Sequence, residues 1–395
     1  MRIEWVGGEL NSFQKGSEGL DHLLSIRVSP KQLQKLTEKF GKERAKLRDA
    51  EVVRFERGEL KPEYPQAPGV AAITVDGGRV QLREEGAGVG VHGQHWTEDK
   101  VAHLATFTRK DHAQDPQPDP PAFLLDPHEV PKLVEALKGA RGQGASSASS
   151  SPETSKDRQH RRDKGDRSHT EPIVRTVVAT LGNSEQFGKM VAAEAARRGF
   201  YQASKRAFLG DGSHWIWNLR QLHFPDFTEI LDFLHLVPYL YAAARAAFRQ
   251  RRDQAWSLYK RMVKLAWSGQ SSEVLGLLRS HADRVGKPPA NASQDDPRKI
   301  LADAVHYVAT NRERMEYPRY RREGLPSSSA YVESLIKQVN RRVKSTEKFW
   351  VVDGLEAMLA VRSAYLSADG RAERFWLERA AGARAVGRNR FRIAA

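Results

Sequence analysis

The sequence contains no cysteine, and this absence excludes disulfides, zinc–thiolate centres and cysteine nucleophiles. Any metal that the protein binds must therefore be held by oxygen or imidazole ligands. The chain also lacks a run of about 18 consecutive apolar residues, which a membrane-spanning helix needs. Its start lacks a basic segment leading into an apolar stretch, so no signal peptide is predicted. We therefore expect a cytoplasmic protein with no membrane partner.

Negative charge is in the minority, with 49 acidic residues against 64 Lys and Arg and a formal net charge of +15. A charge so far from neutrality favours a polyanionic partner, and nucleic acid is the first candidate. The alternative is that the excess Lys and Arg only solvate the surface, because acidic residues are also plentiful. The 395 residues suffice for one large domain or for two to three ordinary ones.

The order of the apolar patterns predicts an α/β fold. Residues 31–60 carry apolar side chains at roughly helical intervals and predict one long helix or a helix pair. Residues 69–84 are typical of a strand, a turn at the Asp-Gly-Gly of 76–78 and a returning strand, and we expect a third strand from Lys100. Helix, strand and helix patterns follow, and then a strand that includes ILDFLH at 230–235. From there the pattern is helical.

Composition and periodicity divide the chain into six parts. They are an N-terminal helical region (1–66), a first strand-containing part (67–140), a flexible Ser- and charge-rich excursion (141–170), a second strand-containing part (171–236), a helical stretch (237–323) and a C-terminal part (324–395). The excursion is expected to be flexible because its few apolar residues cannot offset the entropy of ordering.

Three acidic residues stand out by their context. Asp76 and Asp211 each end a predicted strand before a glycine, and Glu333 lies in the first turn of a predicted helix. Two-metal phosphodiester cleavage needs such acids, because Mg²⁺ takes carboxylate oxygens as ligands. Taken singly, each has a simpler interpretation. Asp-Gly is a common turn, and a glutamate in a first helical turn interacts favourably with the helix dipole.

Several motifs occur in one order along the chain. They are AAITVDGGRVQ, VHGQHWTEDKVAHLATFT, KRAFLGDGSHWIWNLRQLHFPDFTEILDFLH, RMEYPRYRREGLPSSSAYVESLIKQVNRRVKSTEKFW and GLEAMLAVRSAYL. Together they resemble transposases of bacterial insertion sequences of the Kra type, which belong to the Mutator-like group of DDE transposases. The resemblance covers roughly residues 31–380. It implies an α/β RNase H-like catalytic core with a mixed sheet, made of residues 67–140, 171–236 and 324–395 and split by the all-helical insertion at 237–323. It also makes the N-terminal helical region (1–66) a candidate DNA-end-binding unit.

The resemblance also implies the site. Asp76, Asp211 and Glu333 would be the catalytic acids and the metal ligands, on the first strand, the fourth strand and a late helix. The implied cofactor is a pair of Mg²⁺ ions, with Mn²⁺ as an alternative. Asp232 and His235 would form the Asp-x-x-His signature of Mutator-like enzymes and support the site. A hydrogen-bonded structural role is the simpler interpretation of His235.

Basic and aromatic residues extend the prediction to DNA. The candidates are Lys337, Arg341, Lys344, Arg319, Arg321, Arg322 and Trp267. The first three would share a helix face with Glu333, as a phosphate backbone leading into the site requires. The alternative is an ordinary solvated face with an ion pair between Glu333 and Lys337. Trp267 is a candidate for stacking on an unpaired base, and its simpler role is core packing.

The expected function is that of a metal-dependent DNA transposase of an insertion sequence. It would cleave at the ends of its element and transfer the strands into target DNA. Its partner would be double-stranded DNA, comprising the terminal inverted repeats and the target, held by a homodimer or larger assembly associated with the nucleoid. Two alternatives stay open. One is an RNase H-like structure-selective nuclease, and the other is a non-catalytic or decayed DNA-binding remnant. The first 30 residues match nothing in the family pattern and keep the second alternative open.

Overall fold

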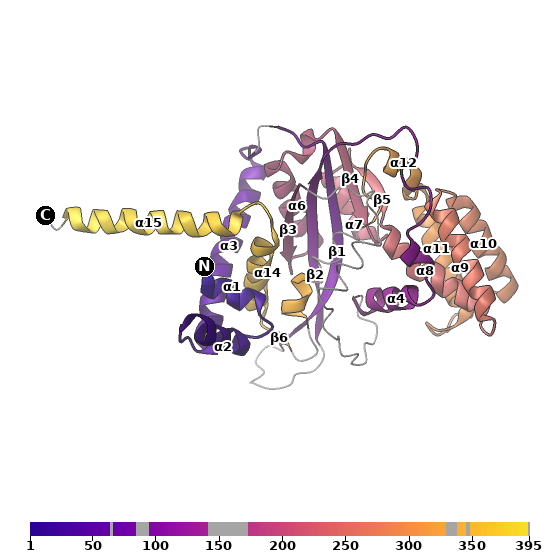
Figure 1. The fold of residues 1–395 in the computed structure, drawn as a ribbon, viewed down its shortest axis with the longest axis horizontal. Coiled ribbons are helices and arrows are strands. Elements are labelled where there is room, and N and C mark those ends of the chain that lie inside the picture. The colour runs from indigo at the N-terminus through magenta and orange to yellow at the C-terminus, as the bar shows by residue number, and fades with distance from the viewer. Residues whose placement is uncertain (64–65, 84–94, 141–172, 329–337, 345–347, 394–395) are drawn as a thin grey trace.

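The computed structural model describes residues 1–63, 66–83, 95–140, 173–328, 338–344 and 348–393 (Figure 1). Over this part of the chain the fold is α/β, with one mixed sheet of six strands. The predicted flexible excursion at 141–170 lies outside the described residues. None of the described helices has the length and apolar character that crossing a membrane requires.

The sheet is built mainly from the first half of the chain. Its strands are β1 (Val70–Leu82), β2 (Trp96–Phe107), β3 (Val174–Thr180), β4 (Lys205–Gly210), β5 (Thr228–Leu231) and β6 (Phe349–Trp350). The spatial order is β3-β2-β1-β4-β5, and β6 pairs with the far end of β1. Strand β2 runs antiparallel to β1 and β3, whereas β4, β5 and β6 run parallel to the strands they pair with.

The prediction of a turn at 76–78 is wrong, because these residues lie within β1, a continuous strand of 13 residues. It pairs with β2 along its length, and Gly78 lies opposite Asp99. A Cβ at Gly78 would lie 2.4 Å from Oδ1 of Asp99, so the glycine allows this close approach rather than a reversal of the chain. Two long strands therefore replace the three-stranded meander, and the loop that joins them falls outside the described residues.

Further helices precede, connect and follow the strands, and the last of them projects away from the sheet (Figure 1). They are α1 (Arg2–Glu9), α2 (Phe13–Leu24), α3 (Pro30–Glu56), α4 (Glu129–Ala140), α6 (Ser184–Arg197), α7 (His214–His223), α14 (Val352–Leu366) and α15 (Arg371–Ile393). The helical pattern predicted at 31–60 is thus one long helix, α3, rather than a pair, and it ends at Glu56. Its start is fixed by Ser29, whose side chain accepts from the Gln32 amide, and by Pro30 at the first helical position.

The all-helical stretch predicted after β5 is present. It comprises α8 (Phe233–Ala247), α9 (Arg252–Trp267), α10 (Ser271–Val285), α11 (Pro297–Asn311) and α12 (Tyr317–Arg322). These helices form a unit at one end of the molecule, opposite the end from which α15 projects (Figure 1). Apolar residues at the helical spacings predicted from the sequence are buried in these helices. Tyr259 and Val263 of α9 are fully buried, for example.

The two faces of the sheet have separate hydrophobic clusters. Strand residues alternate between faces. Ile73 and Leu104 on one face join a large cluster with α6, α7 and α8, and this cluster continues into the helical unit. On the other face, Val80 and Val101 join a smaller cluster with α14 and with residues 338–343. Residues 338–343, which belong to the helix predicted around Glu333, therefore pack on the same face of the sheet as Val101.

The N-terminal helices are joined to the rest of the protein by a buried carboxylate. Glu4 of α1 is fully buried and accepts from Arg44 of α3 at 2.7 and 3.0 Å. It also accepts from Tyr365 of α14 at 2.8 Å and from Trp376 of α15 at 2.9 Å. These hydrogen bonds compensate the Glu4 carboxylate for the water that it loses on burial. The predicted N-terminal region is thus part of the layer that α14 forms.

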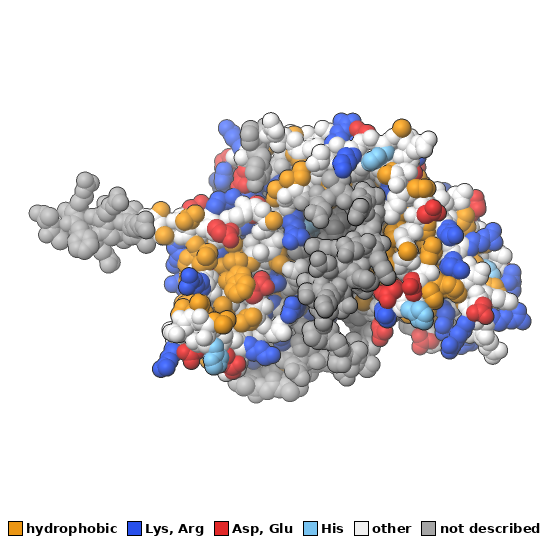
Figure 2. All heavy atoms as spheres, viewed as in Figure 1, with side chains coloured by type: hydrophobic (Ala, Val, Ile, Leu, Met, Phe, Trp, Pro, Cys, Tyr) orange, Lys and Arg blue, Asp and Glu red, His pale blue; other side chains and the backbone are white. Residues whose placement is uncertain are grey.

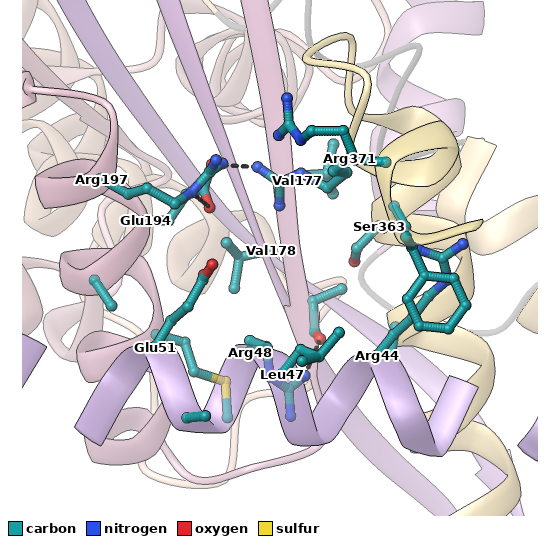
Figure 3. A pocket seen from close by; sticks show the side chains of 18 of the residues that line it. Arg44, Leu47, Arg48, Glu51, Val177, Val178, Glu194, Arg197, Ser363 and Arg371 are labelled. Atoms are coloured by element: carbon teal, nitrogen blue, oxygen red, sulfur yellow. Dashed lines mark hydrogen bonds and ion pairs between the residues drawn. The ribbon is translucent and has the colours of Figure 1, made fainter. Parts of the chain in front are cut away.

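A second polar network lines a cavity of about 340 Å³ between α3, α6, β3, α14 and α15 (Figure 3). Arg197 of α6 donates to Glu194 at 2.8 Å and to Asp369 at 2.9 Å. Arg371, at the start of α15, contacts the same two carboxylates at 2.6 and 2.8 Å. The network joins α6 to the loop between α14 and α15, far along the sequence.

This network gives a prediction for stability. Burial raises the pKa of Glu194, but the charges of Arg371 and Arg197 outweigh it and lower the pKa from 4.5 to about 2. Because the folded-state pKa is depressed, the stabilisation is present above pH 4.5 and is lost as the pH falls toward 2. We expect Glu194→Gln to lower the free energy of unfolding at pH 7 by about 3 kcal/mol and to flatten its dependence on pH between 5 and 2.

Urea denaturation at several pH values measures both effects. The control is Glu185→Gln, an exposed glutamate on the same helix whose loss should change little. Equal stability of the two variants at pH 7 would contradict the role assigned to the network.

Candidate active site

The two aspartates predicted from strands one and four lie side by side in the backbone register. Asp76 is on β1, and Asp211 directly follows β4. The parallel pairing of these strands ends with Thr74 opposite Leu209, so each aspartate lies two residues beyond the same rung. Neighbouring strands are about 4.8 Å apart, and residues two apart on a strand share a face. Both aspartates are partly exposed. The fold therefore brings together two acids that are remote in sequence.

Asp232 continues this row, but its carboxylate has a structural role. The β4–β5 pairing ends with Gly210 opposite Leu231, and the Asp232 amide donates to the Gly210 carbonyl at 2.9 Å. Asp232 is 1% exposed. Its Oδ1 accepts from the Leu234 amide at 3.0 Å, which caps α8, and its Oδ2 lies 3.6 Å from Nε2 of His235. The predicted strand at 230–235 therefore ends early, because an aspartate at this position starts a helix.

The turn after β4 is fixed by the helical unit. Oδ1 of Asp211 accepts from the Ser213 amide at 2.8 Å, and its carbonyl accepts from the Tyr307 hydroxyl of α11 at 2.7 Å. Tyr307 stacks on Tyr239 of α8 with ring centroids 3.8 Å apart. Gly212 has φ +96°, and a Cβ there would lie 2.8 Å from the Tyr307 ring. The insertion thus packs directly against the chain that carries Asp211.

The third predicted acid, Glu333, lies outside the described residues, as does Lys337. The chain after them is held in place. Residues 338–343 are helical, and Arg362 of α14 donates to the Gln338 carbonyl at 2.8 Å. Trp350 of β6 donates to the Val343 carbonyl at 2.9 Å. The chain that follows the predicted Glu333 position is therefore anchored at both of its ends.

This segment lies on the face of the sheet that carries Asp76. Val339 and Val343 belong to one hydrophobic cluster with Val101, the residue opposite Asp76 on β2. Strand β6 then pairs with β1 at Gln81, beyond Asp76. Between the β4 pairing, which ends at Thr74, and this β6 pairing, β1 has no hydrogen-bonded strand on that side among the described residues. Asp76 lies within this interval.

The basic candidates divide into buried and exposed groups. Arg321 is 4% exposed, pairs with both oxygens of Asp115 at 2.8 and 2.5 Å, and lies 4.3 Å above the Trp267 ring. Trp267 is 2% exposed, and its indole donates to the Gln117 carbonyl at 2.8 Å. Both side chains are used within the protein, so the simpler core role holds for Trp267 and base stacking does not. The exposed candidates are Arg319, Arg322 and Arg341.

Lys344 does not lie on a fully solvated helix face. It is half-buried, and its pKa is lowered by burial, while the carboxylates of Asp99 and Asp76 act in the opposite direction. The ammonium therefore lies within electrostatic reach of Asp76, at the edge of the candidate site.

Sequence reasoning missed one acid at this site. Asp99 of β2 is fully buried, and neither of its carboxylate oxygens has a hydrogen-bond partner. Burial raises its pKa to about 6, the nearby backbone amide of Asp99 itself and then Lys344 oppose that rise, and Asp76 and Glu98 add to it. In sequence it belongs to a Glu-Asp-Lys run that resembles an exposed turn. The signal that could have found it is Gly78, which leaves room for a side chain on the neighbouring strand.

The chemistry of Asp76 and Asp211 fits a divalent cation. Two carboxylates on adjacent strands are the oxygen donors that a hard cation prefers. Among the described residues there is no group of three or more His, Asp or Glu that could hold a metal ion. The predicted third ligand, Glu333, is not one of them.

Exposed basic side chains are frequent on the helical unit. On the face drawn in Figure 2, Lys and Arg gather at the end of the molecule formed by this unit. The exposed residues of α8, α9 and the turn between them include Arg245, Arg249, Arg251, Arg252, Arg261 and Lys264. Such a surface suits a polyanion.

Comparisons with known proteins add no family. No protein-family model matches the chain, and no curated protein matches it. The functional interpretation depends on the residues described above and on the ordered motifs of the sequence.

The close contact at Gly212 gives a testable prediction. Gly212→Ala should lower the free energy of unfolding by about 1–3 kcal/mol, because alanine is strained at this φ and its Cβ meets the Tyr307 ring. The matched control is Gly276→Ala in α10, where a Cβ meets nothing within 4 Å. That variant should gain up to about 1 kcal/mol, since alanine favours helix. Urea denaturation measures both, and a neutral Gly212→Ala would show that α11 does not hold this turn.

Proposed function

We propose that the protein is a Mg²⁺-dependent DNA transposase with an RNase H-like core. It binds the ends of its element, cleaves phosphodiester bonds there and joins the freed 3′-hydroxyls to target DNA. The observation that carries the proposal is the register of β1 and β4, which puts Asp76 and Asp211 at one level on adjacent parallel strands. The ordered motifs of the sequence and their resemblance to transposases support the same conclusion.

The order of elements is a second support. The resemblance requires acids on the first and fourth strands, a helical insertion, and then a helix that returns to the sheet. In the chain, β1 carries Asp76, β4 precedes Asp211, and α8 to α12 follow. Residues 338–343 then lie on the face of Asp76. A mixed sheet in which β2 is antiparallel to its neighbours agrees with an RNase H-like core.

The residues that would hold the ions are Asp76, Asp211 and Glu333. Bound Mg²⁺ would supply activation of the attacking hydroxyl or water and stabilisation of the leaving oxygen. The protein's own contacts position the acidic residues. The Ser213 amide and the Tyr307 hydroxyl fix the Asp211 turn, and Asp232 caps α8 beside it. Because Asp232 is 1% exposed and its two oxygens face the Leu234 amide and His235, we assign Asp232 and His235 to support of the site.

Charge supports double-stranded DNA as the partner. The net charge of +15 and the exposed Arg319, Arg322 and Arg341 suit contacts to phosphates, which position a protein on DNA without reading sequence. Holding two element ends at once requires two protomers or more. We therefore propose a dimer or larger assembly on DNA, in the cytoplasm at the nucleoid.

The central prediction concerns the two aspartates. Asp211→Asn and Asp76→Asn should each reduce Mg²⁺-dependent cleavage of duplexes carrying the element ends by more than about a hundredfold, because an amide is a poor ligand for Mg²⁺. Binding to the same duplexes should change little. The control is Asp226→Asn, a 74% exposed aspartate between α7 and β5, which should cleave like the unaltered protein. Gel analysis of end-labelled oligonucleotides measures both properties.

The products of this assay separate the proposal from its alternatives. A transposase yields strands joined to a target duplex, whereas a structure-selective nuclease yields cut strands only. A DNA-binding remnant binds the ends, and neither it nor its Asp211→Asn variant cuts them. Inverted repeats in the DNA flanking the gene supply the duplexes, and cleavage that survives Asp211→Asn would overturn the proposal.

A further inference from the structure

The helical unit formed by α8 to α12 carries most of the protein's excess positive charge. Residues 233–322 contain 17 Lys and Arg against 8 Asp and Glu, whereas the whole chain has 64 against 49. The excess is greatest from Arg245 to Lys264, where seven residues are basic and one, Asp253, is acidic. A positive field this concentrated attracts a polyanion, whereas interspersed charges of both signs mainly keep a protein soluble.

The arginines at the end of α8 and the start of α9 are exposed and unpaired. We call this group the α8–α9 corner, and it consists of Arg245, Arg249, Arg251 and Arg252. Within the described residues none of the four forms an ion pair or a side-chain hydrogen bond. On α3, by contrast, Lys42 pairs with Asp353 and Arg48 pairs with Glu356. The corner therefore differs from an ordinary solvated helix, whose charges are balanced by their neighbours.

The corner is a fixed part of the fold. Phe248 packs against the main hydrophobic cluster and meets the His281 ring of α10 edge-on, with the ring centroids 5.2 Å apart. Arg251 is the N-cap residue of α9 but gives no side-chain cap. It and Arg252 lie at the N-terminal end of this helix, where positive charge is disfavoured. The sequence thus places positive charge where it costs stability, which is typical of a functional surface.

The surroundings of the corner favour a phosphate backbone over a protein or a membrane. No large hydrophobic side chain is exposed anywhere in residues 233–322, all of which the structure describes. Protein interfaces have an apolar and aromatic centre, and a helix that lies on a membrane inserts apolar side chains. Guanidinium groups match phosphate oxygens in geometry and in charge. A nucleic acid backbone is therefore the partner that the corner fits.

We propose that the α8–α9 corner is a second DNA-binding surface, which contacts the phosphate backbone of double-stranded DNA away from the candidate acids. The inference deepens the proposed function and rests on it for the choice of DNA as the polyanion. α8 begins next to the end of β4, because the Asp232 amide donates to the Gly210 carbonyl at 2.9 Å. Its 15 residues span about 22 Å. The corner therefore lies within one turn, about 34 Å, of a duplex held at the acids.

The affinity of the full chain for a duplex of about 30 base pairs and arbitrary sequence tests the inference. Fluorescence anisotropy without divalent cations measures it between about 50 and 200 mM salt. Arg251→Gln/Arg252→Gln should weaken binding about tenfold and reduce the slope of log affinity against log salt by about 2, since each phosphate contact contributes about 0.9. Arg251→Lys/Arg252→Lys keeps the charge and should bind almost as the unaltered protein does.

The matched control is Arg298→Gln/Lys299→Gln. It removes the same charge from the same helical unit, but these two cations pair with Asp296 and Asp303, so their loss should change DNA affinity little. The urea midpoint of Arg251→Gln/Arg252→Gln should not fall, because the substitutions remove positive charge from a helix N-terminus. A lower midpoint with unchanged DNA affinity would assign the arginines to the fold alone and overturn the inference.

Other partners give different outcomes. If Arg251→Gln/Arg252→Gln loses affinity for duplex RNA, polyglutamate or anionic vesicles and none for duplex DNA, the inference fails. The proposed function is decided separately, by cleavage of the element ends. If the unaltered protein binds the duplex through the corner but never cuts, the proposed function fails and this surface stands. Cleavage that depends on Asp211, with DNA affinity and salt slope unchanged in the corner variant, would have the reverse meaning.

Discussion

The parallel pairing of β1 with β4 is the constraint on which the candidate site depends. It is a backbone interaction between strands more than 120 residues apart, and its register alone decides whether Asp76 and Asp211 meet. A shift of one residue would turn one of the two carboxylates to the opposite face. The pairing is secured by side chains that are fully buried on both strands, such as Ile73 and Phe208. The hydrophobic core thus fixes the geometry of two polar groups that lie at its edge.

The helical insertion and the C-terminal chain close around this edge from different sides. Tyr307 of α11 reaches the carbonyl of Asp211, and β6 pairs with β1 beyond Asp76. Between them, β1 is left without a neighbouring strand on that side in the described chain. A sheet whose strands are separated by a long helical stretch needs such contacts, because the returning chain must pack against the strands that precede the stretch. Buried charges at Glu4 and Glu194 mark places where distant segments meet.

The sequence predicted the class of fold and the type of most elements, since their periodicities are long and regular. It failed where local signals compete with tertiary contacts. The Asp-Gly-Gly of 76–78 has the composition of a turn, but long pairing with β2 extends it into a strand. Asp232 lies among apolar residues that favour a strand, yet it caps α8. Asp99 was missed because burial of a charged residue depends on what lies opposite it, which one sequence does not state.

The central claim is that Asp76, Asp211 and Glu333 share one cation site. Titration of the protein with Mn²⁺, followed by the electron paramagnetic resonance of the free ion, measures that site directly. The account predicts that Glu333→Gln binds Mn²⁺ at least about tenfold more weakly than the unaltered protein, as Asp211→Asn should. Equal affinity in the Glu333 variant, with weakened affinity in the Asp211 variant, would contradict the claim that this glutamate shares the site.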